Sequence, residues 1–355
     1  MSDALVPLPP QPDGVPWPTD EWPTGDPPPQ LEPLLDAMFD PDGDLTRAFA
    51  VAVVHRGRLV AERYADVITH FDGPDEPITV DTPLLSWSMA KSMLHALVGM
   101  LVEEGRLELP APADVPLWRA ADDPRRDITL EDLLAMRDGL DFIEDYVDAG
   151  RSDVIEMLFG SGKDDVAAFA ADRPLTATPG ERFNYSSGTT NVISGIVARL
   201  VGAGQPYEDF LQSRLFDAIG MRTAHATFDP AGTFIASSFV YCTARDFARF
   251  GTLYLRDGVW GEDGRRILPV GWVDGARRHR STDEETGNGY GLQWWVDHHD
   301  TEHGTFWANG YEGQSIMVVP GLDLVVVRLG KTEAARSPLL RQWRRDVRAV
   351  FAGAS

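Results

Sequence analysis

The chain has 355 residues, 43% of them hydrophobic and 25% charged, which is typical of a globular protein with one large domain or two ordinary ones. Its 55 acidic and 32 basic residues give a net charge of −23, which excludes nucleic acid and anionic membrane surfaces as expected partners. Its single cysteine, Cys242, excludes a disulfide framework, and no basic segment followed by an apolar run indicates secretion, so we expect a cytoplasmic protein.

Residues 1–30 are predicted to form a separate, proline-rich arm. Eleven of the 26 prolines lie within residues 1–33, and prolines at that density block both helices and sheet ladders. We expect an extended arm with Trp17 and Trp22 as candidate anchors on the body of the protein. A disordered leader is the alternative interpretation.

Residues 31–85 and 286–355 are predicted to build a sheet region. A short helix is expected over 30–39, and the Val-rich alternation of 48–65 predicts a β-hairpin that turns at Arg56-Gly57-Arg58. A second hairpin is expected on either side of Pro320-Gly321-Leu322. The last segment, 337–353, has helical periodicity and begins with Ser337, a candidate N-cap.

Residues 86–285 carry helical patterns and are predicted to form an inserted, helix-rich region between the two parts of the sheet. The expected helices cover 88–104, 129–136, 151–159, 164–171, 188–201, 207–216 and 243–256. The predicted fold class is therefore α/β, with an antiparallel sheet flanked by terminal helices and interrupted by this helix-rich insertion.

The pair Ser88 and Lys91 is the strongest candidate for chemistry. The chain has only three lysines, and Lys91 lies in a long apolar helical segment that begins near Ser88. Residues three apart share a helix face, so the lysine amine can reach the serine hydroxyl. A buried amine loses its charged form more readily and can then act as the base that activates a serine nucleophile. The helix N-terminus favours the negative charge that develops there.

Two further segments supply groups that complete such a site. Tyr185 follows a Pro-Gly turn and precedes a helix, where its phenol could share a proton with Ser88 and Lys91. Residues 307–314 (WANGYEGQ) form a glycine-flanked strand edge that substrate can approach closely. The backbone N–H groups of Ser88 and Tyr311 are the predicted oxyanion hole.

Together these segments resemble the serine β-lactamase and penicillin-binding-protein superfamily over roughly residues 45–350. Three more segments carry the resemblance: ITLEDLL at 128–134, TARDFARFG at 243–251 and YGLQWW at 290–295. The resemblance is greatest to the class C-like branch, which contains carboxylesterases and 6-aminohexanoate-dimer hydrolases. It implies a β-lactamase-like fold, an acyl-enzyme mechanism on Ser88 with Lys91 and Tyr185 as catalytic partners, and no cofactor or metal.

Departures from the lactamase pattern indicate the substrate. Tyr185 is followed by two serines where class C lactamases have Tyr-x-Asn, and Ala308-Asn309-Gly310 occupies the place of Lys-Thr-Gly. The missing lysine would have attracted a β-lactam carboxylate, so β-lactam turnover is not expected as the main activity. The Tyr-Ser-Ser form and residues 141–146 resemble the 6-aminohexanoate-dimer hydrolases. By this resemblance, the expected substrate contacts are Tyr146, Ser187, Trp295, Asn309 and Gly310.

The predicted function is a serine hydrolase that cleaves small esters or linear amides such as 6-aminohexanoate oligomers. The alternatives are a β-lactamase, a DD-peptidase and a non-catalytic member that binds peptides. A Ser-His-Asp triad is not expected, since none of the eight histidines lies in a recognisable triad motif. The basic residues of the last helix are interpreted as a solvated face. A small-molecule substrate is the expected partner, and a homodimer is an open alternative to a monomer.

Overall fold

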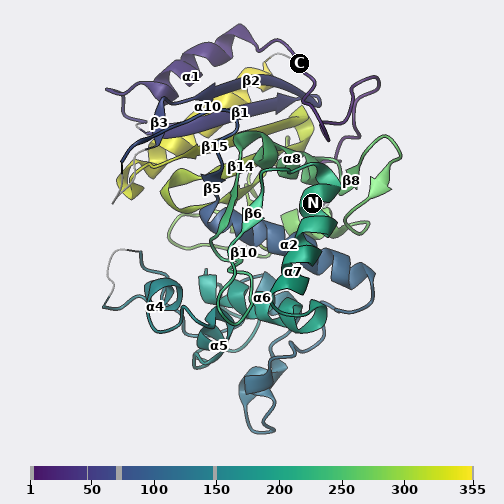
Figure 1. The fold of residues 1–355 in the computed structure, drawn as a ribbon, viewed down its shortest axis with the longest axis vertical. Helices are drawn as coiled ribbons and strands as arrows, with labels where there is room; N and C mark the ends of the chain where they lie inside the picture. The colour runs from purple at the N-terminus through teal and green to yellow at the C-terminus, as the bar shows by residue number, and fades with distance from the viewer. Residues whose placement is uncertain (1–3, 46, 69–73, 147–149, 354–355) are drawn as a thin grey trace.

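An antiparallel sheet of eight strands forms the upper half of the molecule in Figure 1, a computed structural model that describes residues 4–45, 47–68, 74–146 and 150–353. The strands lie in the order β10-β11-β12-β13-β14-β15-β1-β2. They are β1 (Ala48–His55), β2 (Arg58–Tyr64), β10 (Ser281–Thr282), β11 (Gly289–Tyr290), β12 (Trp295–Val296), β13 (Phe306–Asn309), β14 (Ser315–Val319) and β15 (Leu324–Gly330).

The central strands are largely apolar, as expected for a sheet whose two faces are both covered by helices. β1 pairs with β2 on one side and with β15 on the other. Ala50, Ala52 and Val54 pack into one hydrophobic core, whereas Val51 and Val53 point to the other face and join a second core. Strands buried on both faces are expected to be near-continuous hydrophobic runs, which is the pattern of the sequence here.

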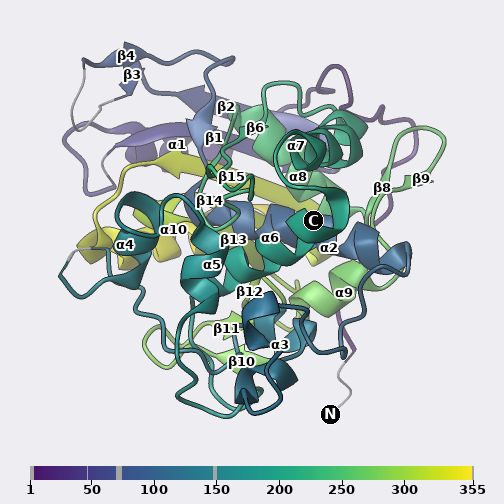
Figure 2. The ribbon, with the colours of Figure 1, turned by 60° about the horizontal axis from the view of Figure 1, so that its bottom comes forward.

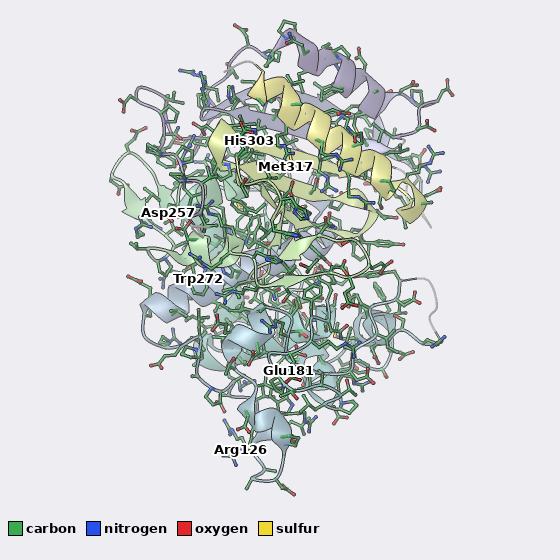
Figure 3. All side chains as sticks on the ribbon, turned by 180° about the vertical axis from the view of Figure 1, so that it is seen from behind. Arg126, Glu181, Asp257, Trp272, His303 and Met317 are labelled. Carbon is green, nitrogen blue, oxygen red and sulfur yellow. The ribbon has the colours of Figure 1, made fainter. Side chains whose placement is uncertain are left out.

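Two terminal helices cover one face of the sheet, and an internal helix covers the other. α1 (Glu32–Phe39) and α10 (Ser337–Ala352) share the second core with Val51 and Val53 (Figure 3). α8 (Ala244–Leu255) packs on the opposite face, against β1, β14 and β15. It approaches closely, because a Cβ added at Gly251 would lie 2.6 Å from Cγ1 of Val325.

The helix-rich half lies below the sheet in Figure 1 and comes forward in Figure 2. Its helices are α2 (Ala90–Glu103), α3 (Leu130–Leu134), α4 (Asp153–Phe159), α5 (Val166–Ala171), α6 (Ser187–Val201), α7 (Gln205–Leu211) and α9 (Trp272–Arg277). Short strands connect these parts: β3 (Val67–Ile68) with β4 (Glu76–Pro77), β7 (Val240–Cys242) between β5 (Leu84–Leu85) and β6 (His225–Ala226), and β8 (Val259–Trp260) with β9 (Arg265–Arg266). No helix in the described ranges is long and apolar enough to cross a bilayer.

The predicted elements are present, with corrections at particular ends. Both hairpins form, and Arg56 and Gly57 make the first turn with positive φ angles of 50° and 74°. Ser337 is the first residue of α10 and not its cap, since no side chain caps that end. The helix predicted over 207–216 divides into α7 and a π-helical turn, Gln212–Phe216. Helix α9 was not expected from the sequence.

Residues 4–30 of the proline-rich arm follow an extended path over the body, and residues 1–3 lie outside the described part. Trp22 is only 9% exposed, and the ring of Trp17 lies 5.2 Å from that of Trp260. Backbone carbonyls of the arm accept hydrogen bonds from buried guanidinium groups of the body, which belong to Arg249, Arg256 and Arg277. These contacts fix the arm on the protein, in place of the alternative of a disordered leader.

Candidate active site

The candidate nucleophile lies in a strained turn between the two halves of the molecule. Ser88 is part of a short 3-10 turn, Trp87–Met89, that leads directly into α2. Trp87 has a φ angle of +44°, which is rare for a residue with a side chain and is typical of functional sites. Buried Ser86 holds the turn in place, because its hydroxyl donates to the carbonyl of Ser238 and accepts from the N–H of Val240, both at 3.1 Å.

Lys91 lies one helical turn after Ser88 and is 1% exposed. Its Nζ is 2.9 Å from Oγ of Ser88, 3.0 Å from Oγ of Ser187 and 3.0 Å from the carbonyl oxygen of Ser237. A neutral amine has two N–H donors and one lone pair. If the two donors are used by Ser187 and Ser237, the lone pair remains for the hydroxyl proton of Ser88. This arrangement is the one that a lysine general base requires.

Burial lowers the pKa of Lys91 from 10.5 to about 8, and the nearby Glu144 carboxylate partly opposes that shift. The difference corresponds to roughly 3 kcal/mol by which the site disfavours the ammonium form. At neutral pH about a tenth of the amine is therefore unprotonated, and the fraction rises steeply above pH 8. Both the geometry and the lowered pKa are therefore compatible with a base at this position.

Glu144 is a site residue that sequence reasoning missed. Its carboxylate accepts hydrogen bonds from the backbone N–H of Ser187 at 2.8 Å, from the Ser187 hydroxyl at 2.5 Å and from the Tyr146 hydroxyl. The Ser187 hydroxyl donates to Glu144 and can therefore accept from Lys91. The available sequence signal was its position two residues before Tyr146, in the segment that resembles the 6-aminohexanoate-dimer hydrolases.

Ser187 lies away from the cleft, although it was expected to contact substrate. Its side chain is fully buried at the start of α6, and it joins Lys91 to Glu144. Asn191, one turn further along α6, donates to Oγ of Ser237 at 3.1 Å and accepts from the Ser237 N–H at 3.2 Å. Asn191 thereby fixes the carbonyl that Lys91 uses. Neither Asn191 nor Ser237 was predicted as a site residue. A backbone carbonyl acceptor, such as that of Ser237, can belong to any residue type and so leaves no signal in the sequence.

Tyr185 completes the group around the candidate nucleophile. The Ser88 side chain lies close enough to the Tyr185 hydroxyl to influence the pKa of the phenol, and the centroid of the tyrosine ring lies 5.0 Å from Nζ of Lys91. Burial raises the pKa of Tyr185 far above its usual value, and the Glu144 charge adds to that shift. The phenol therefore stays protonated at neutral pH and suits the role of proton donor. Trp295 packs beside it with the ring centroids 5.2 Å apart.

The predicted strand edge closes the site from the other half of the molecule. β13 ends at Asn309, and Gly310 leads into the turn Tyr311–Gly313. A Cβ added at Gly310 would lie 2.4 Å from the carbonyl oxygen of Ser86, so only glycine allows this edge to meet the nucleophile turn. The rings of Tyr311 and Trp87 also meet edge to face at 5.6 Å. The two predicted oxyanion donors thus belong to segments in direct contact.

A cleft of about 660 Å³ opens over these groups. Ser88 is 8% exposed at its floor, and Lys91 lies below the floor. Most of the residues predicted from the sequence line the cleft, namely Ser88, Tyr146, Tyr185, Trp295, Asn309, Gly310 and Tyr311. Tyr146 stacks on Tyr311 with ring centroids 4.7 Å apart, so the two form one wall beside the nucleophile.

The chain is similar in sequence to known enzymes and penicillin-binding proteins. The family model "Beta-lactamase" matches residues 35–350. A 6-aminohexanoate-dimer hydrolase of Paenarthrobacter ureafaciens is 30% identical over 276 residues, which cover 73% of this chain and 68% of that protein. Penicillin-binding protein 4 of Amycolatopsis lactamdurans is 28% identical over 334 residues, which cover 83% of this chain and 80% of that protein.

A solved structure shows the same fold. It is a candidate 6-aminohexanoate-dimer hydrolase from Bacillus anthracis, with a TM-score of 0.72 and 24% sequence identity, and the match covers 96% of this chain and 89% of that one. The predicted fold class, an α/β fold of the β-lactamase type, is confirmed by these matches.

Proposed function

Because the chain belongs to the beta-lactamase family of serine hydrolases, we propose that it cleaves small esters or linear amides through an acyl-enzyme on Ser88. One observation carries the proposal: the buried Lys91 amine has acceptors for two N–H donors in Ser187 and Ser237, and its nitrogen lies 2.9 Å from the Ser88 hydroxyl. Such a contact serves proton transfer, whereas a lysine kept only for structure gains nothing from burial.

In the first half of the reaction, Lys91 accepts the proton of Ser88 while Oγ attacks the substrate carbonyl carbon. The N–H groups of Ser88 and Tyr311 stabilise the oxyanion. The bond from the carbonyl carbon to the leaving group then breaks, and the Tyr185 phenol protonates the departing oxygen or nitrogen. The Lys91 ammonium returns a proton to the tyrosinate, so both groups regain their starting state.

In the second half, water takes the place of the leaving group. Tyr185 and Lys91 draw its proton in the reverse of the same relay, and the hydroxide attacks the acyl carbon. Ser88 leaves with a proton that comes back through Lys91. The assignment of Lys91 as base and Tyr185 as donor follows from their pKa values, since burial lowers that of Lys91 and raises that of Tyr185.

For the substrate we propose short linear amides of the 6-aminohexanoate type, with small esters as further substrates. The 30% identical relative named as a 6-aminohexanoate-dimer hydrolase supports this choice. Ala308, in the place of the lactamase lysine, is 1% exposed and brings no charge toward a β-lactam carboxylate. The penicillin-binding relative makes β-lactam or peptide substrates the second candidate.

Labelling with a fluorophosphonate followed by peptide mass analysis tests the nucleophile. We expect modification of Ser88 in the native protein and none in Ser88→Ala, with Ser161→Ala, an exposed serine, as a control that is still labelled. Initial rates on p-nitrophenyl butyrate, the linear 6-aminohexanoate dimer and nitrocefin then test the substrate class. Labelling at another residue would refute the role of Ser88, and nitrocefin turnover faster than that of the dimer would favour the second candidate.

A further inference from the structure

A stripe of arginines on α10 borders the same cleft as the candidate nucleophile. Residues 341, 344, 345 and 348 are spaced by three and four, so their side chains share one face of the helix. All four line the cleft, whereas Trp343, Val347 and Phe351 on the adjacent face pack into the core. The stripe is therefore part of the wall of the cleft, and not the solvated face that the sequence suggested.

The cleft is locally basic although the chain is strongly acidic. Six basic side chains line it against three acidic ones, on a protein whose net charge is −23. The acidic groups are Asp297, Glu312 and Glu333, and the basic ones outside the stripe are Arg47 and Lys331. On a protein with so many more acidic than basic residues, a cleft lined at random would contain mostly carboxylates. The excess of basic side chains therefore indicates a role for positive charge in the cleft.

The stripe has few internal partners. Arg348 pairs with Asp300 at 2.8 Å and with Asp297 at 3.3 Å. Arg345 donates to the side-chain oxygen of Gln342 at 2.6 Å. In the part of the chain that the structure describes, no ion pair reaches Arg341, Arg344 or Arg345.

The electrostatics of Arg344 reflect this lack of a counter-charge. Burial, together with the neighbouring charges of Arg341 and Arg345, lowers the pKa of Arg344 to about 10. No acidic group contributes in the opposite direction. Arg341 and Arg344 are partly buried and Arg345 beside them is exposed, so three like charges repel one another at this edge of the cleft, and an external anion would relieve that repulsion.

The floor between the nucleophile and the stripe is apolar. Trp295 pairs with Trp307 across β12 and β13, and Trp307 pairs with Met317 across β13 and β14. All three line the cleft, and Met317 is seen beside α10 in Figure 3. A ligand that extends from Ser88 to α10 thus meets a reactive serine, then an apolar surface, then unpaired guanidinium groups.

We propose that Arg341 and Arg344, with Arg345 beside them, bind a carboxylate at the far end of the substrate, so that the enzyme prefers esters and amides in which an apolar spacer separates the scissile carbonyl from a free carboxylate. Guanidinium groups bind carboxylates in two-point hydrogen bonds, which suits this role better than a lysine would. The inference rests on the proposed hydrolase function and specifies its substrate.

Matched ester pairs test this proposal. The mono-4-nitrophenyl esters of adipic, suberic and sebacic acid carry a free carboxylate at increasing distance, and their methyl-capped analogues do not. We expect the native protein to prefer the free acid of at least one length in kcat/KM. In Arg341→Gln/Arg344→Gln the preference should fall roughly tenfold or more through KM, with the capped esters unaffected. The control of equal charge change is Arg126→Gln/Arg265→Gln. Both arginines are exposed, and Arg126 lies at the far end of the helix-rich half in Figure 3.

Two results would overturn the proposal: no preference for the free acids at any length, or a preference that the double variant keeps. Turnover of the capped esters tests the hydrolase function separately. If no ester is hydrolysed, calorimetric titration of Ser88→Ala with suberate still decides the binding question. Binding that the added arginine substitutions abolish would support the carboxylate site, and binding that they leave unchanged, or no binding, would refute it.

Discussion

Replacing Glu144 by glutamine removes a negative charge that acts on the Lys91 amine through a single intervening hydroxyl. The hydrogen bonds from Nζ to Oγ of Ser187 and from that oxygen to Glu144 are 3.0 and 2.5 Å long, so the charges lie no more than about 5.5 Å apart. At that separation a unit charge pair is worth roughly 3 kcal/mol at an effective dielectric of 20 and roughly 0.8 kcal/mol at the dielectric of water.

The sign of the effect follows from which form the carboxylate stabilises. Glu144 favours the ammonium form of Lys91 and therefore raises its pKa. Burial has the larger, opposite effect, and the two together leave the pKa at about 8. Its neutralisation should lower that pKa by about 0.5 to 2 units. The lysine must be neutral to act as base, so the rising limb of kcat/KM against pH should move to lower pH, with a midpoint roughly between 6 and 7.5.

The assay is the pH dependence of kcat/KM for p-nitrophenyl butyrate between pH 5 and 10. Glu181→Gln is the control, because Glu181 is exposed, lies four residues before Tyr185 in the sequence and loses the same charge in water. Its profile should match that of the native protein. A midpoint in Glu144→Gln that stays in place or moves upward would refute the electrostatic coupling, and with it the assignment of Lys91 as the base.

Three other changes test other parts of the structure. Lys91→Met removes the base and should lower kcat/KM by about a hundredfold or more without a loss of melting temperature. The control Lys163→Met, at an exposed lysine, should change neither quantity. Retention of about a tenth of the activity in Lys91→Met would contradict the mechanism. Gly310→Ala forces the strand edge away from the Ser86 carbonyl and should lower both activity and melting temperature. The control Gly275→Ala, with no atom closer than 4.0 Å to the new Cβ, should be tolerated. Equal effects of the two substitutions would count against the close approach at Gly310. Deletion of residues 1–24 removes the carbonyl acceptors of three buried arginines, worth about 1 kcal/mol each, and the buried side chain of Trp22. The melting temperature measured by calorimetry should therefore fall by on the order of 5–10 °C. An unchanged melting temperature would show that the arm contributes nothing to stability.

Local patterns in the sequence predicted the parts of the site that depend on local geometry. Ser88 and Lys91 are three residues apart on one helical segment, so their contact follows from helix periodicity alone. The hairpins and the terminal helices likewise follow from alternation and helical spacing. Tyr185, Tyr146 and Tyr311 came from motifs, and their shared position around one cleft required the fold.

The remaining parts depend on tertiary contacts that no spacing encodes. Glu144 and Ser187 are separated by 43 residues, and the carbonyl of Ser237 lies 146 residues from Lys91 in sequence. The carbonyls that hold the arm are invisible in a sequence for the same reason. The arginine stripe on α10 was misinterpreted because helical periodicity shows which residues share a face, but not whether that face meets solvent or a cleft.

The pairing of β1 with β15 has a consequence for how the protein is made. Residue 48 is paired with residue 330, so a strand from the beginning of the chain must wait for one near its end. At a synthesis rate of about 5–20 residues per second, that delay lasts roughly a quarter of a minute to one minute. During this time the Val-rich hairpin of β1 and β2 has one open, apolar edge. We expect the nascent chain to need chaperone protection on the ribosome, and its yield in rapid overexpression to improve at low temperature.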